Sequence, residues 1–196
     1  MELLHTDRFH VEGEWHILWK VNSPHKARNL LWRICRECVP TRLRLQSQHV
    51  QCEMICPWCD TAVEDDCHAF VGCTVARESW YWAGLLTVLQ PQVGTMSSLV
   101  DFVFDICRSE SRGIAGRVAL LLWQIWVARN DVIWNDAHHT SMSIRRTTLD
   151  AWQQWQEVHK QPSPRGNLYN TGRIECTVTA QFRRDVVEVQ CGCCIP

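Results

Sequence analysis

Four metal-binding side chains lie close together between residues 56 and 73. Cys56 and Cys59 form a C-x2-C pair, His68 follows after eight residues, and Cys73 follows after four more. Thiolate and imidazole are preferred ligands of zinc, and a C-x2-C turn presents two sulfurs to one ion. Three Cys and one His close a tetrahedral shell and leave no position for a catalytic water. The spacing therefore predicts a structural Zn site at Cys56, Cys59, His68 and Cys73.

Two other interpretations of this motif stay open. Cys56-Pro-Trp-Cys59 is similar to the redox motif of glutaredoxin-like proteins, where a helix amino terminus stabilises a thiolate. Residues 51–55 are not typical of a buried strand, however, and the acids that follow the motif would raise a nearby thiol pKa. The cysteines could also be unreactive core residues.

Other cysteines complicate the choice of ligands. Cys52 and Cys67 lie near enough in sequence to replace one of the four. Cys191, Cys193 and Cys194 form a second group without an obvious fourth ligand, and we interpret them as an incidental tail.

Charge is strongly segregated along the chain. Between residues 20 and 49 there are seven Lys or Arg and one acid, whereas residues 50–105 contain eight acids and one Arg. The basic segment predicts phosphate contacts with RNA or DNA. A solvated helix face, or docking on the acidic segment, would produce the same pattern. The candidate nucleic-acid-binding residues are Lys20, Lys26, Arg28, Arg33, Arg36, Arg42 and Arg44.

Composition limits the remaining classes of function. The chain has 196 residues, of which 46% are hydrophobic and 21% charged, so we expect one globular domain with an appendage. The longest apolar run, 118–128, is shorter than the roughly 20 residues of a membrane span, and no secretory signal begins the sequence. We therefore expect an intracellular protein, with the nucleus as one candidate compartment, and no membrane partner. Eleven Trp are present, and we expect most of them in the core.

Catalytic motifs are missing from the sequence. It contains no Gly-rich phosphate loop, no Gly-x-Ser-x-Gly and no His-Glu-x-x-His. We expect neither enzymatic activity nor a small-molecule substrate.

Hydrophobic periodicity predicts the elements that position these residues. Three- and four-residue spacing predicts helices over 24–38, 74–89, 98–106, 113–135 and 143–160. Val39-Pro40 interrupts the first helix, and Thr41 can begin a short helix over 42–45. Thr74 can cap the helix over 74–89, and Ser97 or Ser98 can cap the helix over 98–106. Alternation over 173–182 predicts one strand.

The predicted fold is mainly α. A small helical domain nucleated by a zinc knuckle, residues 15–108, precedes a helical connector, residues 109–160. Residues 161–196 then form a linker and a short β tail.

Several motifs resemble a known family. Trp15-x3-Trp19-Lys20, Pro24-x-Lys26, Leu31-Trp32-Arg33 and Val39-Pro40-Thr41-Arg42, followed by the Cys and His pattern, resemble the zinc-binding domain that follows the reverse transcriptase of plant LINE-type (non-LTR) retrotransposons. Leu122-Trp123-x-Ile125-Trp126-x2-Arg129-Asn130 and Ile133-Trp134 look like the family's helical connector. Residues 172–182 are similar to the first strand of its ribonuclease H-like domain.

The resemblance implies a non-catalytic nucleic-acid-binding zinc module. Thr179 stands where the family's ribonuclease H-like strand carries an acidic metal ligand, and the start of that domain is truncated here. Neither Tyr81 nor Tyr169 is followed by the Ala-Asp-Asp of the polymerase. The competing hypotheses are a zinc-scaffolded module that binds a protein partner and a retroelement fragment without function.

Overall fold

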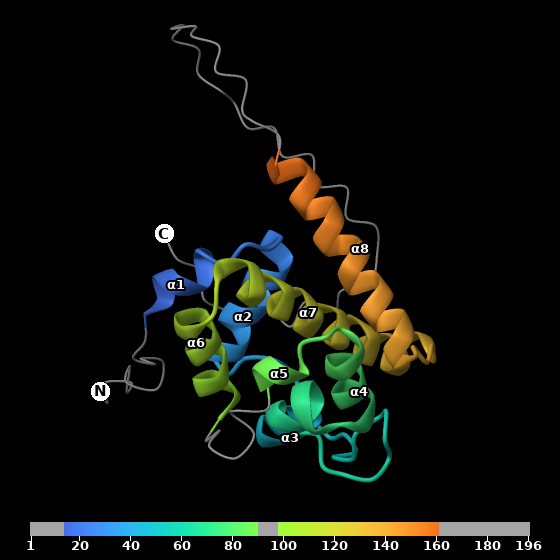
Figure 1. The fold of residues 1–196 in the computed structure, drawn as a ribbon. Helices are drawn as coiled ribbons and strands as arrows, with labels where there is room; N and C mark the ends of the chain where they lie inside the picture. Colours follow the sequence, from blue (N-terminus) through green and yellow to red (C-terminus); the bar gives the residue numbers. More distant parts are fainter. Residues whose placement is uncertain (1–13, 90–97, 161–196) are drawn as a thin grey trace, which may run out of the picture. The chain divides into compact units, whose positions relative to one another are not determined.

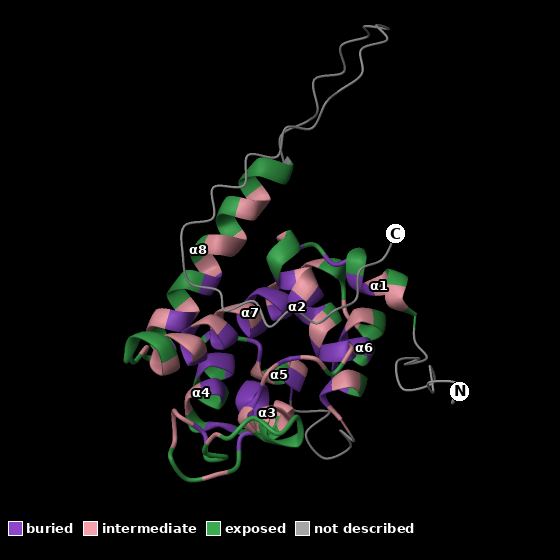
Figure 2. Cartoon of the chain, turned by 180° about the vertical axis from the view of Figure 1, so that it is seen from behind, coloured by how far each residue is buried: buried purple, intermediate pink, exposed green. Residues whose placement is uncertain are grey.

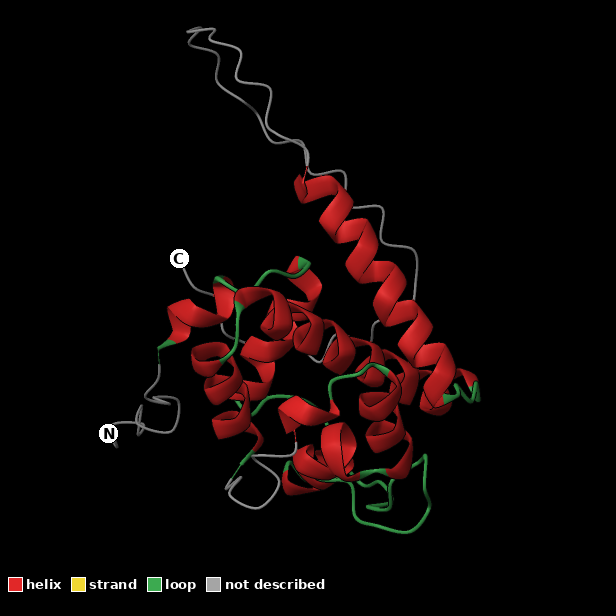
Figure 3. Cartoon of the chain, viewed as in Figure 1, coloured by secondary structure: helices red, strands yellow, loops and turns green. Residues whose placement is uncertain are grey.

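The computed structural model describes residues 14–89 and 98–160, which belong to one structural unit and are mainly helical. Figures 1 and 3 show helices connected by loops, of which the one over residues 48–67 is long, and in this part of the chain the only strand-like pairing is an isolated bridge between Ile55 and Val63. The mainly α prediction is therefore confirmed, whereas the predicted strand over 173–182 lies outside the described residues. The elements are α1 (Trp15–Trp19), α2 (His25–Cys35), α3 (Arg42–Ser47), the π-helical segment η2 (His68–Gly72), α4 (Thr74–Trp82), α5 (Leu86–Leu89), α6 (Leu99–Ser109), α7 (Arg112–Asn135) and α8 (Ser141–Lys160).

Side-chain caps begin two of the longer helices. Ser98 accepts a hydrogen bond from the backbone N–H of Asp101 at the start of α6. Ser98 is one of the two residues that were predicted as possible caps of this helix. Ser111 does the same for Ile114 at the start of α7. Thr41 precedes α3 as predicted, but its hydroxyl donates to Asp66 Oδ1 at 2.8 Å. Its side chain therefore ties α3 to the loop over residues 48–67, which contains Glu64, Asp65 and Asp66 and is called the acidic loop below.

Two predicted helices are shorter than expected. The helix predicted over 24–38 ends at Cys35, because Glu37 adopts a left-handed conformation with φ 51°. The helix predicted over 74–89 is two helices, α4 and α5, separated at Gly84 with φ 67°. Glycine reaches that conformation without the steric cost of a Cβ atom, so the chain can turn there.

Helix α7 lies at the centre of the hydrophobic core. Its middle, residues 118–122, is fully buried, and α7 packs on α2, α4, α6 and α8. Figure 2 shows stretches of buried residues, in purple, on α2, α4, α6 and α7. Residues on both sides of position 108 thus contribute to one core. The proposed division between residues 15–108 and 109–160 stays a prediction.

The tryptophans differ in how far they are buried. Only Trp80 and Trp126 are buried, and Trp80 donates its indole N–H to Phe70 O at 2.9 Å. Five others are partly buried, and four are exposed: Trp19, Trp32, Trp82 and Trp134. Trp15, Trp58, Trp123 and Trp152 pack against the core, so six of the eleven Trp lie in or against it, although only two are buried. No described helix combines the length and the apolar character needed to cross a bilayer.

Gly116 permits the close approach of another segment to α7. A Cβ atom at this position would lie 1.9 Å from Asn22 O and 3.1 Å from Trp152 Cζ3. The backbone after α1 and the side chain from α8 therefore both require a glycine here.

We predict that Gly116→Ala destabilises the protein by about 1–3 kcal/mol, because backbone atoms must move to accept the methyl group. Gly113→Ala in the same helix is the control, since the nearest atom lies 3.9 Å away and Ala gains about 0.5–1 kcal/mol over Gly in a helix. Urea unfolding followed by circular dichroism measures both. Equal stabilities for the two variants would contradict the packing described here.

Candidate metal centre

A tight turn presents the first two thiols of the predicted zinc site. Cys56 N–H donates to Ala62 O at 2.8 Å, and Asp60 N–H donates to Cys56 O at 3.0 Å. Asp60 has φ 51°, so the chain reverses direction directly after Cys59. The bridge between Ile55 and Val63 closes the base of this turn. Cys56 and Cys59 are thereby held at one end of a short loop.

The third and fourth ligands come from the helical segments that follow. His68 begins η2, and Cys73 is the residue directly before α4. Cys73 N–H donates to His68 O at 2.8 Å, which is the i to i+5 hydrogen bond of a π-helix. This wider turn brings residues five positions apart close together. The π-helical segment therefore places His68 and Cys73 at one site.

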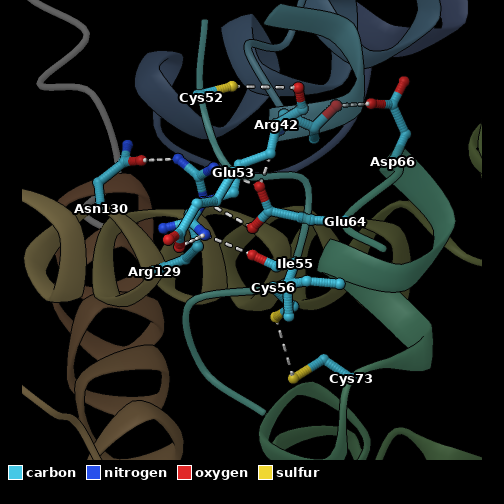
Figure 4. A network of polar contacts seen from close by, with 11 residues as sticks. Arg42, Cys52, Glu53, Ile55, Cys56, Glu64, Asp66, Cys73, Arg129 and Asn130 are labelled. Carbon is cyan, nitrogen blue, oxygen red and sulfur yellow. Dashed lines mark hydrogen bonds and ion pairs between the residues drawn. The ribbon is translucent and has the colours of Figure 1, made fainter. Parts of the chain in front are cut away.

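The structure brings all four predicted ligands together. The ligand atoms of Cys56, Cys59, His68 and Cys73 all lie within 4.8 Å of one another. The Cys56 and Cys73 sulfurs, which face each other in Figure 4, are 3.9 Å apart, and Cys59 Sγ lies 3.4 Å from His68 Nε2. Around a tetrahedral zinc ion, sulfurs at about 2.3 Å and nitrogen at about 2.05 Å would be separated by about 3.8 Å and 3.6 Å, respectively. The donor set fits zinc.

Backbone N–H groups surround the sulfurs. Those of Trp58 and Cys59 bond to Cys56, and those of Thr61 and Ala62 bond to Cys59. The first amides of α4, from Val75 and Ala76, bond to Cys73. These donors stabilise negative charge on sulfur, and zinc binds the thiolate form. At Cys59 and Cys73 the surroundings thus favour the charge state that a zinc site requires.

The thiol pKa values reflect these contacts. A hydrogen bond from Cys56, assisted by the α4 amides, lowers the pKa of Cys73. Burial raises the pKa of Cys59, but hydrogen bonds from the Thr61 hydroxyl and the neighbouring amides outweigh it, so the net pKa is lowered. Donation to Cys73, together with burial, raises the pKa of Cys56.

The two spare cysteines lie outside the group of four. Cys52 Sγ donates to Arg42 O at 3.5 Å, away from the ligand atoms. Burial, and next the charge of Asp65, raise the pKa of Cys67, which disfavours its thiolate. The redox interpretation also loses support, because turns rather than a helix follow Cys56 and Cys59. Cys191, Cys193 and Cys194 lie outside the described residues.

A buried ion pair holds the acidic loop against α7. Glu64, fully buried, receives hydrogen bonds from Arg129 of α7, with Nε 2.8 Å from Oε1 and Nη2 bonded to Oε2 (Figure 4). The backbone N–H of Arg42 also donates to Glu64 Oε2 at 3.0 Å. Arg129 Nη1 bonds to Asn130 Oδ1, and its guanidinium lies 4.8 Å from the Trp126 ring centroid. Both charges are therefore compensated by several polar contacts.

Sequence reasoning missed this pair. Charge counting placed Glu64 only among the eight acids of residues 50–105, whereas the structure buries it against Arg129. A signal existed, because Arg129 directly follows the apolar run of α7 and falls within its buried portion. A buried cation needs an acidic partner. Periodicity could not identify which of the acids was that partner.

The two other acids also have contacts within the chain. Asp65 Oδ1 accepts the backbone N–H of His68 at 2.6 Å, which holds the start of η2. Asp66 accepts hydrogen bonds from Thr41 and, at 2.6 Å, from Arg44 Nη2.

The predicted nucleic-acid-binding residues divide into two groups. Arg42 and Arg44 of α3 face the acidic loop: Arg42 Nη1 donates to Ile55 O and lies 3.6 Å from Glu53, and Arg44 pairs with Asp66. For these two arginines the docking alternative describes the structure. The remaining five lie on or beside α1 and α2: Lys20, Lys26, Arg28, Arg33 and Arg36.

Two lysines of the α1 and α2 segment carry positive charge that no ion pair within residues 14–89 and 98–160 neutralises. Residues 15–36 contain no Asp or Glu. Lys20 and Lys26 are exposed, and among the described residues neither of them forms an ion pair. Lys26 Nζ lies 5.7 Å from the Trp123 ring centroid, and Arg28 Nη1 donates to Trp19 O at 3.0 Å. This segment is therefore the better candidate for phosphate contacts.

We predict that the purified chain contains about one equivalent of zinc and that Cys56→Ser loses it, because three remaining ligands leave the tetrahedral shell open. Cys67→Ser is the matched control and should retain the metal. Elemental analysis measures the content, and chelation should unfold residues 50–80. Less than half an equivalent in the unaltered chain would exclude this site.

We predict that Arg129→Met destabilises the protein by about 3–5 kcal/mol, because it leaves the Glu64 carboxylate buried without its cation. The control is Arg146→Met, which removes an exposed pair with Asp150 at 3.9 Å and should cost no more than about 0.5 kcal/mol. Urea unfolding compares the two. A similar small loss from both variants would show that the buried pair adds little.

The amino-terminal part of the chain matches a known protein family. Residues 2–80 match the zf-RVT family model, described as zinc-binding in reverse transcriptase. No curated protein and no solved structure matches the chain. The matched range contains the four candidate ligands, Glu64 and the whole of α1, α2 and α3. The chain thus carries a region similar to the zinc-binding part of reverse transcriptases, and within it a compact Cys3His cluster.

Proposed function

We propose that the chain is a nucleic-acid-binding zinc module, derived from the reverse transcriptase of a plant LINE-type retrotransposon and acting inside the cell. The observation that carries the proposal is the placement of a Cys3His cluster and an acid-free basic segment within one region similar to the zinc-binding part of reverse transcriptases. Zinc would be structural, since four protein ligands occupy its tetrahedral shell.

In this proposal the metal orders the loop and the loop supports the basic helices. Arg42 and Arg44 join α3 to the acidic loop, while α2 packs against α7. Lys20 and Lys26 then face solvent and contact phosphates of RNA or DNA. Such contacts release counterions, so binding weakens as salt rises.

We further propose that the chain has no catalytic activity by itself. Polymerases and ribonucleases H use carboxylates that converge on divalent metal ions. Here Glu64 binds Arg129, Asp65 holds the start of η2, and Asp66 binds Arg44. The proposed ribonuclease H-like start has Thr179 at its acidic position, which lies outside the described residues.

A second candidate function is a protein-interaction module. Tyr81 and Trp82 are both exposed at the end of α4, and their rings pack edge to face with centroids 5.1 Å apart. Exposed aromatic pairs are common anchors in protein interfaces. Burial of aromatic rings depends little on salt, whereas phosphate contacts weaken as salt rises, so the two functions make different predictions about salt.

We predict that RNA affinity falls steeply with ionic strength and that Lys20→Glu with Lys26→Glu weakens it for all sequences. Loss of two phosphate contacts should reduce the slope of log affinity against log salt by about 1.4 for a single strand. Arg145→Glu with Arg146→Glu on α8 is the charge-matched control. Fluorescence anisotropy measures both, and binding that ignores salt would favour the protein-interaction function.

We predict no cleavage of an RNA/DNA hybrid and no primer extension by the pure chain with magnesium or manganese, because its acidic cluster is held by internal contacts. Activity above background that disappears in Asp65→Asn would contradict the non-catalytic proposal.

A further inference from the structure

Exposed rings and cations share one face of the α1 and α2 segment. Each residue of an α-helix advances by about 100°, so His25, Asn29, Trp32 and Arg36 fall within an arc of about 60° on α2. The buried residues of α2, including Leu30 and Ile34, lie on the opposite side. The outer face of α2 is thus a row of polar and aromatic side chains.

The row continues onto α1 through ring contacts. Trp19, the last residue of α1, lies 5.9 Å from the His25 ring, measured between centroids. Further along α2, the Arg36 guanidinium lies 6.0 Å from the Trp32 ring centroid. Trp19 is 39% exposed and Trp32 is 37% exposed. Two indole rings therefore remain accessible, and His25, which Trp19 contacts, lies about 10 Å along the helix axis from Trp32.

Cations flank this row on both sides. Arg28 lies on one side of it on the helical wheel, and Lys26 and Arg33 lie on the other. Residues 15–36 contain no acid, so the α1 and α2 segment itself contributes only positive or neutral side chains to this surface. Accessible aromatic faces between backbone-contacting cations are the combination used to hold single strands.

We propose that this face binds single-stranded nucleic acid, with bases stacked on Trp19 and Trp32 and phosphates contacted by the flanking cations. The inference rests on the proposed function and names its substrate class. A double helix fits less well, because the faces of its bases are already stacked on their neighbours. A protein with an acidic surface could use the cations but would have no bases to place on the rings.

The test compares strands that differ only in their bases. A single-stranded oligonucleotide, the corresponding duplex and an abasic strand of equal length are titrated against the full chain by anisotropy. The single strand should bind at least tenfold more tightly than the duplex or the abasic strand. Equal binding of the abasic strand would overturn the stacking inference, because phosphates alone would then account for the affinity.

Matched variants separate this inference from the proposed function. Trp32→Ala should weaken single-strand binding about five- to hundredfold, whereas Trp32→Phe should retain most of it. Trp82→Ala, an exposed Trp on α4, is the control. If Lys20→Glu with Lys26→Glu weakens binding but Trp32→Ala does not, the stacking inference fails and the nucleic-acid function stands. If no nucleic acid binds at micromolar protein, both fail.

Discussion

The buried pair of Glu64 and Arg129 is the interaction on which the arrangement of the zinc-binding region depends. Removing two charges from water is costly, and the cost is offset only when each charge has several good polar contacts. Here the carboxylate has the guanidinium and the first amide of α3, and the guanidinium has Asn130 and the Trp126 ring. The acidic loop, α3 and α7 therefore have to pack together for both charges to keep their polar contacts.

This constraint explains how the positive charge is divided. Because Glu64 and Asp66 hold the loop against α3 and α7, the arginines of α3 are committed to internal contacts. The cations of α1 and α2 are not needed for that task and lie beside exposed rings. Charge that is continuous in the sequence thus lies in two different settings, one within internal ion pairs and one at the surface.

Local features of the sequence predicted more than long-range features did. The Cys and His spacing predicted the group of four, since neighbouring turns bring these residues together, and Ser98 was one of two predicted caps. The break at Gly84 was missed, because an apolar period continues across it. The partner of Arg129, 65 residues away, depends on packing that no local pattern contains. The exposure of Trp19, Trp32, Trp82 and Trp134 was not predicted for a similar reason, because ring burial depends on how helices meet.

The number of residues between the candidate ligands His68 and Cys73 depends on the π-helical geometry of η2. Deleting one residue between His68 and Cys73 would replace the wide turn by an ordinary helical turn and rotate everything that follows by about 100°. Cys73 directly precedes α4, so the rotation would carry the buried face of α4, including Trp80, away from the core. Evolution could therefore vary this spacing only if the ligand and the α4 face changed together, which makes the four-residue interval between His68 and Cys73 a stringent marker of this architecture.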